Sequence, residues 1–240
     1  MSRVASIFKR EFGGYFRTPV AYVFLVVFLM LSVGLAFFVG QFFDSNVASL
    51  ESYFSFHPWL FIFFAAAVGM RLWAEEKKNG TIELLFTLPI TPLDAVLGKF
   101  LAAWAFLSIA ILLSFPMAIT IGFLGSPDWG VVITSYFGSI LMAGSFLAVS
   151  SLTSAFTRNQ VISFVVSVCV NLVLVLMGWS IFNGAMGRVM PQWLVDTISN
   201  FSTMPHFEPF TKGMVDLKDV VFFLSLTTFC LFLNVVALER

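Results

Sequence analysis

Residues 20–43 read VAYVFLVVFLMLSVGLAFFVGQFF, and no residue in this stretch carries a charge. About 20 consecutive apolar residues are enough for a helix to cross the hydrocarbon core of a bilayer. Lipid offers no hydrogen-bonding partners to peptide groups, so a segment of this kind satisfies its backbone by forming a helix. The stretch therefore predicts a membrane-spanning helix.

Five more apolar runs follow, each near or above the length that a crossing needs. They predict helices over 53–74, 99–124, 131–156, 160–182 and 219–238. The composition fits a bilayer as solvent, because 59% of the 240 residues are hydrophobic and 11% are charged, against roughly a quarter charged in a soluble domain. We therefore expect an all-α polytopic membrane protein with six transmembrane helices in a single domain, 1–240.

Lysine and arginine are distributed unequally between the two sides of this predicted bundle. Ten fall on one side: Arg3, Lys9, Arg10, Arg17, Arg71, Lys77, Lys78, Lys99, Arg158 and Arg240. Three fall on the other: Arg188, Lys212 and Lys218. Because basic residues accumulate in cytoplasmic loops, we expect both termini in the cytoplasm. Thirteen basic residues balance thirteen acidic ones, so bulk charge gives no reason to expect nucleic acid as a partner.

Residues 1–19 alternate apolar and basic positions at helical spacing. The apolar positions on one side are Val4, Ile7, Phe8, Phe12, Tyr15 and Phe16. This pattern predicts an amphipathic helix that lies on the cytoplasmic leaflet. Two roles remain open for it: a positively charged anchor for the first crossing, or a mechanical elbow that passes motion from a partner into the first helix.

The loop 73–100, WAEEKKNGTIELLFTLPITPLDAVLGKF, carries more apolar residues than a connector needs. Gly80 ends the preceding helix and Thr81 can cap a new one, which stops before Pro89. Its apolar face would consist of Ile82, Leu84, Leu85 and Leu88. Such a face needs a cover, and either the membrane interface or the groove of another protein would supply one.

The tract 183–219 contains a second short helical pattern on the predicted outer side. Trp193, Leu194, Ile198 and Phe201 recur at helical spacing behind Pro191, a good first-turn residue. We expect short outer re-entrant helices between the fifth and sixth crossings. The alternative is a surface loop packed at the interface by its aromatic side chains.

Catalytic and metal-binding patterns are absent from the sequence. His57 and His206, both placed at outer-side ends, have no ligands at metal-binding spacing and are expected to form interfacial hydrogen bonds. The sequence has no HExxH, no G-x-S-x-G and no P-loop, which disfavours an intramembrane enzyme. The deep polar residues Asn171 and Asn234 are expected to bond helix to helix, and Pro116 is expected to kink the third crossing.

The crossings carry no ionisable residue away from their ends. Charged residues inside a membrane are typical of proton and ion coupling, so their absence disfavours an ion-coupled secondary transporter or channel. A non-transporting membrane scaffold remains open. If the chain transports, its energy must come from another protein.

The loop 73–100 resembles that of the membrane subunits of ABC-2-type ATP-binding-cassette exporters. The residues that carry the resemblance are Glu75, Glu76, Gly80, Thr81, Ile82, Glu83, Leu84, Leu85, Pro89, Gly98 and Lys99. The outer tract is similar to that of the gliding-motility-associated branch of these permeases. Its matching residues are Ser199, His206, Phe207, Phe210, Lys212, Gly213, Asp216 and Asp219.

The resemblance implies a coupling helix, 80–88, seated in a cleft of an ATPase subunit. The coupling residues would be Gly80, Thr81, Ile82, Glu83, Leu84 and Leu85, with Arg158 in a second, weaker contact. It also implies that the outer helices close the exit of a translocation path. The outer gate would consist of Trp193, Phe201, His206 and Phe207.

The resemblance further implies the composition of a complex in a bacterial cytoplasmic (inner) membrane. Two permease subunits, the same chain twice or a pair of relatives, would bind two ATPase subunits that hold ATP and Mg²⁺, and this chain would carry no cofactor and no catalytic residue. The branch also implies an accessory membrane subunit with a large outer domain. The chain departs from some relatives in its short outer tract 44–57, which leaves no room for the large domain that they insert there.

Overall fold

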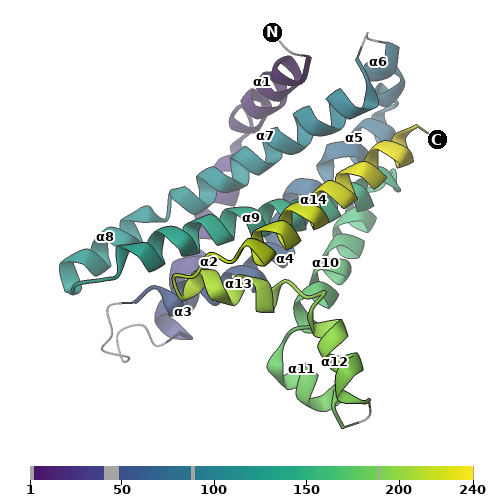
Figure 1. Cartoon of the computed structure of the whole chain (residues 1–240). Helices are drawn as coiled ribbons and strands as arrows, with labels where there is room; N and C mark the ends of the chain where they lie inside the picture. The colour runs from purple at the N-terminus through teal and green to yellow at the C-terminus, as the bar shows by residue number, and fades with distance from the viewer. Residues whose placement is uncertain (1–2, 41–48, 88–89, 189, 240) are drawn as a thin grey trace.

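The computed structural model describes residues 3–40, 49–87, 90–188 and 190–239, without the side chains of 84–86. These residues form helices and contain no strand, and the long helices pack into one bundle (Figure 1). The first seven helices are α1 Arg3–Phe16, α2 Pro19–Phe38, α3 Glu51–Phe54, α4 His57–Gly69, α5 Arg71–Asn79, α6 Thr81–Thr87 and α7 Pro92–Leu112. The next seven are α8 Phe115–Leu124, α9 Trp129–Ala155, α10 Gln160–Leu176, α11 Ser180–Met186, α12 Gln192–Ser199, α13 Met204–Thr211 and α14 Leu217–Leu238.

Five helical units are long and apolar enough to cross a membrane, and a bent pair makes a sixth. The five are Pro19–Phe38, Glu51–Asn79, Pro92–Leu124, Trp129–Ala155 and Leu217–Leu238. The bent pair is α10 with α11. The prediction of an all-α, multi-pass membrane protein is therefore confirmed, with five to six candidate crossings.

The predicted fifth helix, 160–182, does not run straight to its end, because α10 and α11 meet at 75°. The bend lies where α13 approaches the end of α10. A Cβ on Gly178 would stand 2.4 Å from Ser202 Oγ and 2.5 Å from Pro205 Cδ. Ser202 Oγ also donates to the carbonyl of Leu174 at 2.6 Å, satisfying a carbonyl that a continued helix would have bonded. The apolar run continues through this bend, so hydropathy gave no sign of it.

The third crossing starts at Pro92 rather than at 99. Thr91 and Asp94 form a capping box, in which Thr91 Oγ1 accepts from the Asp94 N–H at 3.2 Å and Asp94 Oδ2 accepts from the Thr91 N–H at 3.1 Å. The capping residues precede the apolar run from which the helix was predicted, so the prediction started too late. The same crossing is interrupted after Leu112, and Pro116 lies in the first turn of α8, as its missing N–H predicts.

Helix α9 lies at the centre of the bundle and packs against α4, α7, α10, α13 and α14. Its small residues allow this close packing: a Cβ on Gly69 of α4 would stand 2.4 Å from Ser150 Cβ. Two buried amides bond to the same helix, Asn171 Nδ2 to Ser150 Oγ at 3.3 Å and Asn234 Nδ2 to Ser151 Oγ at 2.7 Å. The predicted helix-to-helix role of both asparagines is confirmed.

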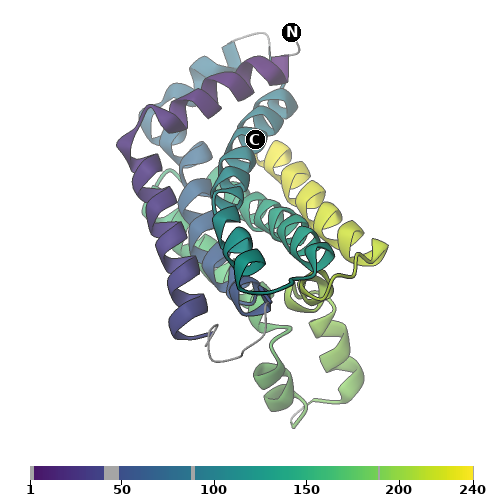
Figure 2. The same cartoon turned by 90° about the vertical axis from the view of Figure 1, so that its left-hand side faces the viewer.

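Both ends of the chain lie at the same end of the bundle, together with α6, whereas α11 and α12 project from the opposite end (Figure 1). Helix α1 lies across the end that carries α6, and α2 runs from there along the side of the bundle (Figure 2). We call this end the α6 end. It gathers the elements that the sequence placed on one side of the membrane.

Candidate functional site

The α6 end is built around a sharp reversal between α5 and α6. Gly80 has φ +69 and its N–H bonds to the carbonyl of Glu76, so it closes α5 in the left-handed conformation that glycine adopts most readily. Thr81 begins α6 at once, and its hydroxyl donates to the same Glu76 carbonyl at 3.4 Å. Thr81 therefore helps to close α5. The sequence suggested it as a cap for the next helix, and in the structure it is the first residue of α6.

Helix α6 presents a polar side to solvent. Thr81 and Glu83 are exposed, whereas Ile82 is half-buried and packs against the core. Leu84 and Leu85 belong to the helix by their backbone, but their side chains lie outside the described structure, as do Leu88 and Pro89. Of the predicted apolar face, only Ile82 is therefore placed, and it points toward this protein.

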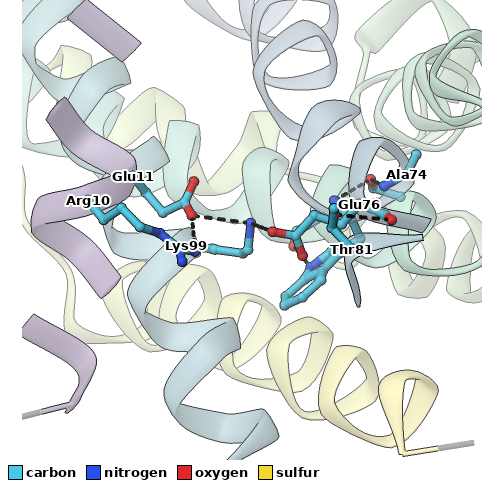
Figure 3. A network of polar contacts seen from close by, with 9 residues as sticks. Arg10, Glu11, Ala74, Glu76, Thr81 and Lys99 are labelled. Carbon is cyan, nitrogen blue, oxygen red and sulfur yellow. Dashed lines mark hydrogen bonds and ion pairs between the residues drawn. The ribbon is translucent and has the colours of Figure 1, made fainter. Parts of the chain in front are cut away.

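Lys99 of α7 lies between Glu11 of α1 and Glu76 of α5 and joins these three helices (Figure 3). Its side chain is only 4% exposed, and its Nζ lies 2.8 Å from Glu76 Oε1 of α5 and 3.5 Å from Glu11 Oε1 of α1. The ammonium also stands 5.3 Å from the centre of the Trp73 ring. A buried charge is tolerated when it is paired in this way. Lys99 thus links the N-terminal helix, the helix before α6 and the third crossing.

The pKa of Glu11 reflects the same junction. Burial of the carboxyl acts to raise its pKa, but the Lys99 cation and the neighbouring Arg10, whose Nη2 lies 2.7 Å from Glu11 Oε1, outweigh this effect. The pKa of Glu11 is therefore lowered from its ordinary value. The carboxylate is charged at neutral pH and serves as a permanent partner for Lys99.

Gly98 allows α1 to lie against α7. A Cβ at this position would stand 2.7 Å from Ile7 Cβ, and Ile7 is buried. Farther along α1, the ring of Tyr15 stacks on Phe106 of α7 with centroids 4.9 Å apart. Part of the apolar side of the amphipathic helix is thus covered by the third crossing, so the two helices are packed together as one unit.

Ser154 of α9 fixes the beginning of α5. Helix α4 ends at Gly69 and α5 begins at Arg71, which leaves the first N–H groups of α5 without partners in their own helix. Ser154 Oγ accepts from the N–H groups of Trp73 at 3.1 Å and Ala74 at 3.0 Å, and donates to the Met70 carbonyl at 2.9 Å. The helix that carries α6 is therefore bonded to the centre of the bundle.

Arg158, the predicted second contact, is exposed in the turn between α9 and α10. The turn lies beside α5, because Lys77 Nζ donates to the carbonyl of Ala155. The structure thus brings the short turn and the α5–α6 unit together at one end of the bundle.

The predicted outer gate divides into two parts. Phe207 is 3% exposed, and His206 Nδ1 lies 2.6 Å from Asp219 Oδ1 while its ring stacks on Phe222. Trp193 and Phe201 are each 66% exposed. His206 thus holds α13 against α14, Phe207 is buried in the core, and the other two side chains are exposed.

Phe210 is the main residue of this region that the gate prediction left out. It is fully buried, and a Cβ on Gly138 would stand 2.6 Å from its Cγ. Its carbonyl accepts from Thr134 Oγ1 at 2.9 Å and Ser135 Oγ at 3.2 Å, so α13 is docked on α9. The sequence feature that could have indicated Phe210 is its position among the other aromatic residues of the outer tract.

His57 is buried between the helices of the bundle. The residue is fully buried, Nδ1 lies 2.8 Å from Ser139 Oγ, and the rings of Tyr53 and Phe54 have centroids within 4.9 Å. The expected hydrogen bond is thus present, with a partner inside the bundle, and the place of His57 at an outer-side end stays a prediction. Within the part of the chain that the structure describes, no three His, Cys, Asp or Glu side chains could hold a metal ion together.

The fold and the α6 end define a multi-pass helical membrane protein without a nucleotide-binding motif. A family model described as "ABC-2 family transporter protein" matches residues 58–225, from α4 into α14. Because this match covers more than half of the chain, the protein belongs to the ABC-2 transporter family. Members of this family are membrane components and normally non-catalytic. None of the curated proteins compared with the chain matches it.

Proposed function

We propose that the chain is the membrane-spanning permease subunit of an ATP-binding-cassette exporter, driven by a separate ATPase subunit. The observation that carries this proposal is α6. It extends beyond the crossing Glu51–Asn79, exposes Glu83, and is connected to α1, α7 and α9 through α5. A short helix held in this way at the end of the bundle is suited to receive force from another protein.

In the proposed mechanism, ATP closure of two ATPase subunits pushes on α6 in each of two permease subunits. Motion of α6 reaches α5 directly through Gly80. The Lys99 pairs then transmit it to α1 and α7, and Ser154 to α9. The bundles rock against each other and open the path alternately to the two sides, with ATP and Mg²⁺ bound only by the partner.

The proposed orientation puts the α6 end in the cytoplasm of a bacterium, with the protein in the inner membrane. Both termini lie at that end (Figure 1), which agrees with an even number of crossings. The end also carries most of the basic residues, the feature that directs loops to the cytoplasm.

At the opposite end, we propose that α11 and α12 re-enter the membrane and form the outer gate with Trp193 and Phe201. Their exposed aromatic surfaces support contact with lipid or a second subunit. His206 would hold the gate to α14 through Asp219, and the buried Phe207 would anchor it in the core. An accessory membrane subunit and membership of the gliding-motility-associated branch remain proposals drawn from the outer tract, as does the choice between a homodimer and a heterodimer.

The proposal is tested by affinity purification of the chain from its native membrane in mild detergent, with quantitative mass spectrometry. A near-stoichiometric P-loop protein is expected. The variant Glu83→Arg, which reverses an exposed charge on α6, should lose that partner while still inserting in the membrane. Asp196→Arg reverses an exposed charge on α12 at the opposite end and serves as the matched control.

Purification of the chain alone, from membranes in which it is active, would exclude the exporter and favour a channel or a scaffold. Flux that follows an ion gradient without ATP would favour a secondary transporter. Retention of the ATPase by Glu83→Arg, with unchanged ATP-dependent transport, would show that α6 is not the contact.

A further inference from the structure

A polar cavity of about 220 Å³ lies between α1, α5 and α7 at the α6 end. Four of its lining residues are charged, the acids Glu11 and Glu75 and the bases Arg71 and Lys99. At roughly 30 Å³ per water molecule, the cavity has the volume of about seven waters. A phosphate and a primary ammonium joined by two carbons are on this scale.

The charges around the cavity are arranged for a ligand that is itself a zwitterion. Arg71 Nε lies 3.4 Å from Glu75 Oε2 and Lys99 Nζ lies 3.5 Å from Glu11 Oε1, both longer than the 2.7–2.9 Å typical of charge-assisted hydrogen bonds. Lys99 has its close partner elsewhere, in Glu76 at 2.8 Å. Arg71 is therefore the cation of the cavity that is best able to donate hydrogen bonds to an anionic group.

The two acids remain able to accept further donors. The contacts of Glu11 with Arg10 and with Lys99 both use Oε1, which leaves Oε2 for a ligand. The side chain of Glu75 is 43% exposed and that of Arg71 is 42% exposed, so an incoming group can reach both without unfolding the junction. A primary ammonium has three N–H donors and can bond both carboxylates at once.

The position of the cavity points to the membrane as the source of the ligand. It lies under the C-terminal half of α1, whose alternating basic and apolar residues suit the headgroup level of a bilayer. Thr18, which also lines the cavity, is followed directly by the apolar helix α2, where Val20 and Val23 are more than half exposed. A lipid whose headgroup fills the cavity could thus lay its acyl chains beside α2.

We propose that this cavity binds the phosphoethanolamine headgroup of a lipid in the same leaflet as α1. The phosphate contacts Arg71, and the ammonium donates to Glu11 and Glu75. A choline headgroup lacks N–H donors and leaves the acids unsatisfied. A purely anionic headgroup would be repelled by the carboxylates of Glu11 and Glu75. The bound headgroup would bridge α1 to α5, the two helices that flank the Lys99 junction.

The experiment uses the full chain in detergent, freed of lipid, and measures lipid binding by native mass spectrometry. The probes are phosphatidylethanolamine, phosphatidylcholine and phosphatidylglycerol with identical acyl chains, and water-soluble glycerophosphoethanolamine as competitor. Phosphatidylethanolamine is expected to bind about tenfold more tightly than either other lipid, the scale of one charge-assisted contact. Arg71→Gln and Glu75→Gln should each abolish this preference, whereas Lys78→Gln, an exposed base on the same helix that does not line the cavity, should keep it.

Equal binding of phosphatidylcholine, or tighter binding of phosphatidylglycerol, by the wild-type chain would overturn the proposal without any variant. If both glutamine variants still preferred phosphatidylethanolamine, the lipid would bind at another site and the proposal would be wrong. Competition by glycerophosphoethanolamine at the affinity of the lipid would show that the ligand comes from water and would overturn the assignment to a membrane lipid. Each glutamine variant is compared with wild type in thermal unfolding, so that misfolding is recognised.

Discussion

Replacing Lys99 by methionine tests whether the junction of α1, α5 and α7 is an electrostatic connection. Methionine keeps much of the length and apolar volume of the lysine stem, so the change mainly removes the charge. In the wild-type protein the Glu76 side chain is 19% exposed, and its Oε2 is buried with no hydrogen-bond partner within the described residues. The substitution would remove the partner of Oε1 as well. Removing one partner of a buried ion pair costs roughly 3–5 kcal/mol.

We expect the lower limit of this range, about 3 kcal/mol, because Glu76 and Glu11 retain some solvent and Glu11 keeps Arg10. At roughly 2–4 °C per kcal/mol for a chain of this size, the midpoint of thermal unfolding in detergent should fall by about 6–12 °C. The double variant Lys99→Met/Glu76→Gln removes the stranded charge and should recover most of the loss.

The assay is thermal unfolding of both variants and of wild type, together with ATP-dependent transport in the presence of the ATPase. A midpoint for Lys99→Met within about 2 °C of wild type, less than the shift from 1 kcal/mol, would refute the idea that the buried pair supports the junction. A double variant no more stable than the single one would show that the loss came from packing and not from a stranded carboxylate.

Three further changes test the contacts at the two ends. Gly98→Leu should push α1 off α7 and cost about 1–3 kcal/mol by overpacking, seen as a lower unfolding midpoint, whereas Gly13→Leu, in open space, should leave the midpoint unchanged. Gly80→Val forces a β-branched residue to φ +69, at a cost of roughly 1–2 kcal/mol, and should weaken co-purification of the ATPase more than membrane insertion. His206→Ala leaves the buried Asp219 without its hydrogen-bond partner and should lower the unfolding midpoint. The double variant His206→Ala/Asp219→Asn should restore part of the lost stability. No recovery would mean that the stacking of His206 on Phe222 contributes more than its contact with Asp219.

The helical fold was predictable because a bilayer leaves little choice. Apolar runs of crossing length must be helices, and the small and amide residues that join them, such as Asn171 and Asn234, follow from the same constraint. Helix ends were less predictable. The bend at Gly178 comes from the approach of Ser202 and Pro205, which are far along the chain, and hydropathy records no such contact.

The site was predictable only in part for the same reason. The reversal at Gly80 could be derived from the sequence, because a glycine after a charged helix is a common termination signal. The partners of Lys99 could not, because Glu11 and Glu76 belong to helices whose packing no local pattern encodes. The burial of His57 could not be derived either, because its partner Ser139 belongs to α9, 82 residues farther along the chain.

The bend between α10 and α11 also limits the length of straight helix in the candidate fifth crossing. The 17 residues of α10 rise about 26 Å at 1.5 Å each, which is less than the roughly 30 Å of a typical hydrocarbon core. Its neighbour α9, with 27 residues, rises about 40 Å. A short crossing is accommodated by local thinning of the bilayer, at a fraction of a kcal/mol per Å. If the bilayer thins there, a lipid beside α10 would have a shorter stretch of hydrocarbon to cross than a lipid beside α9.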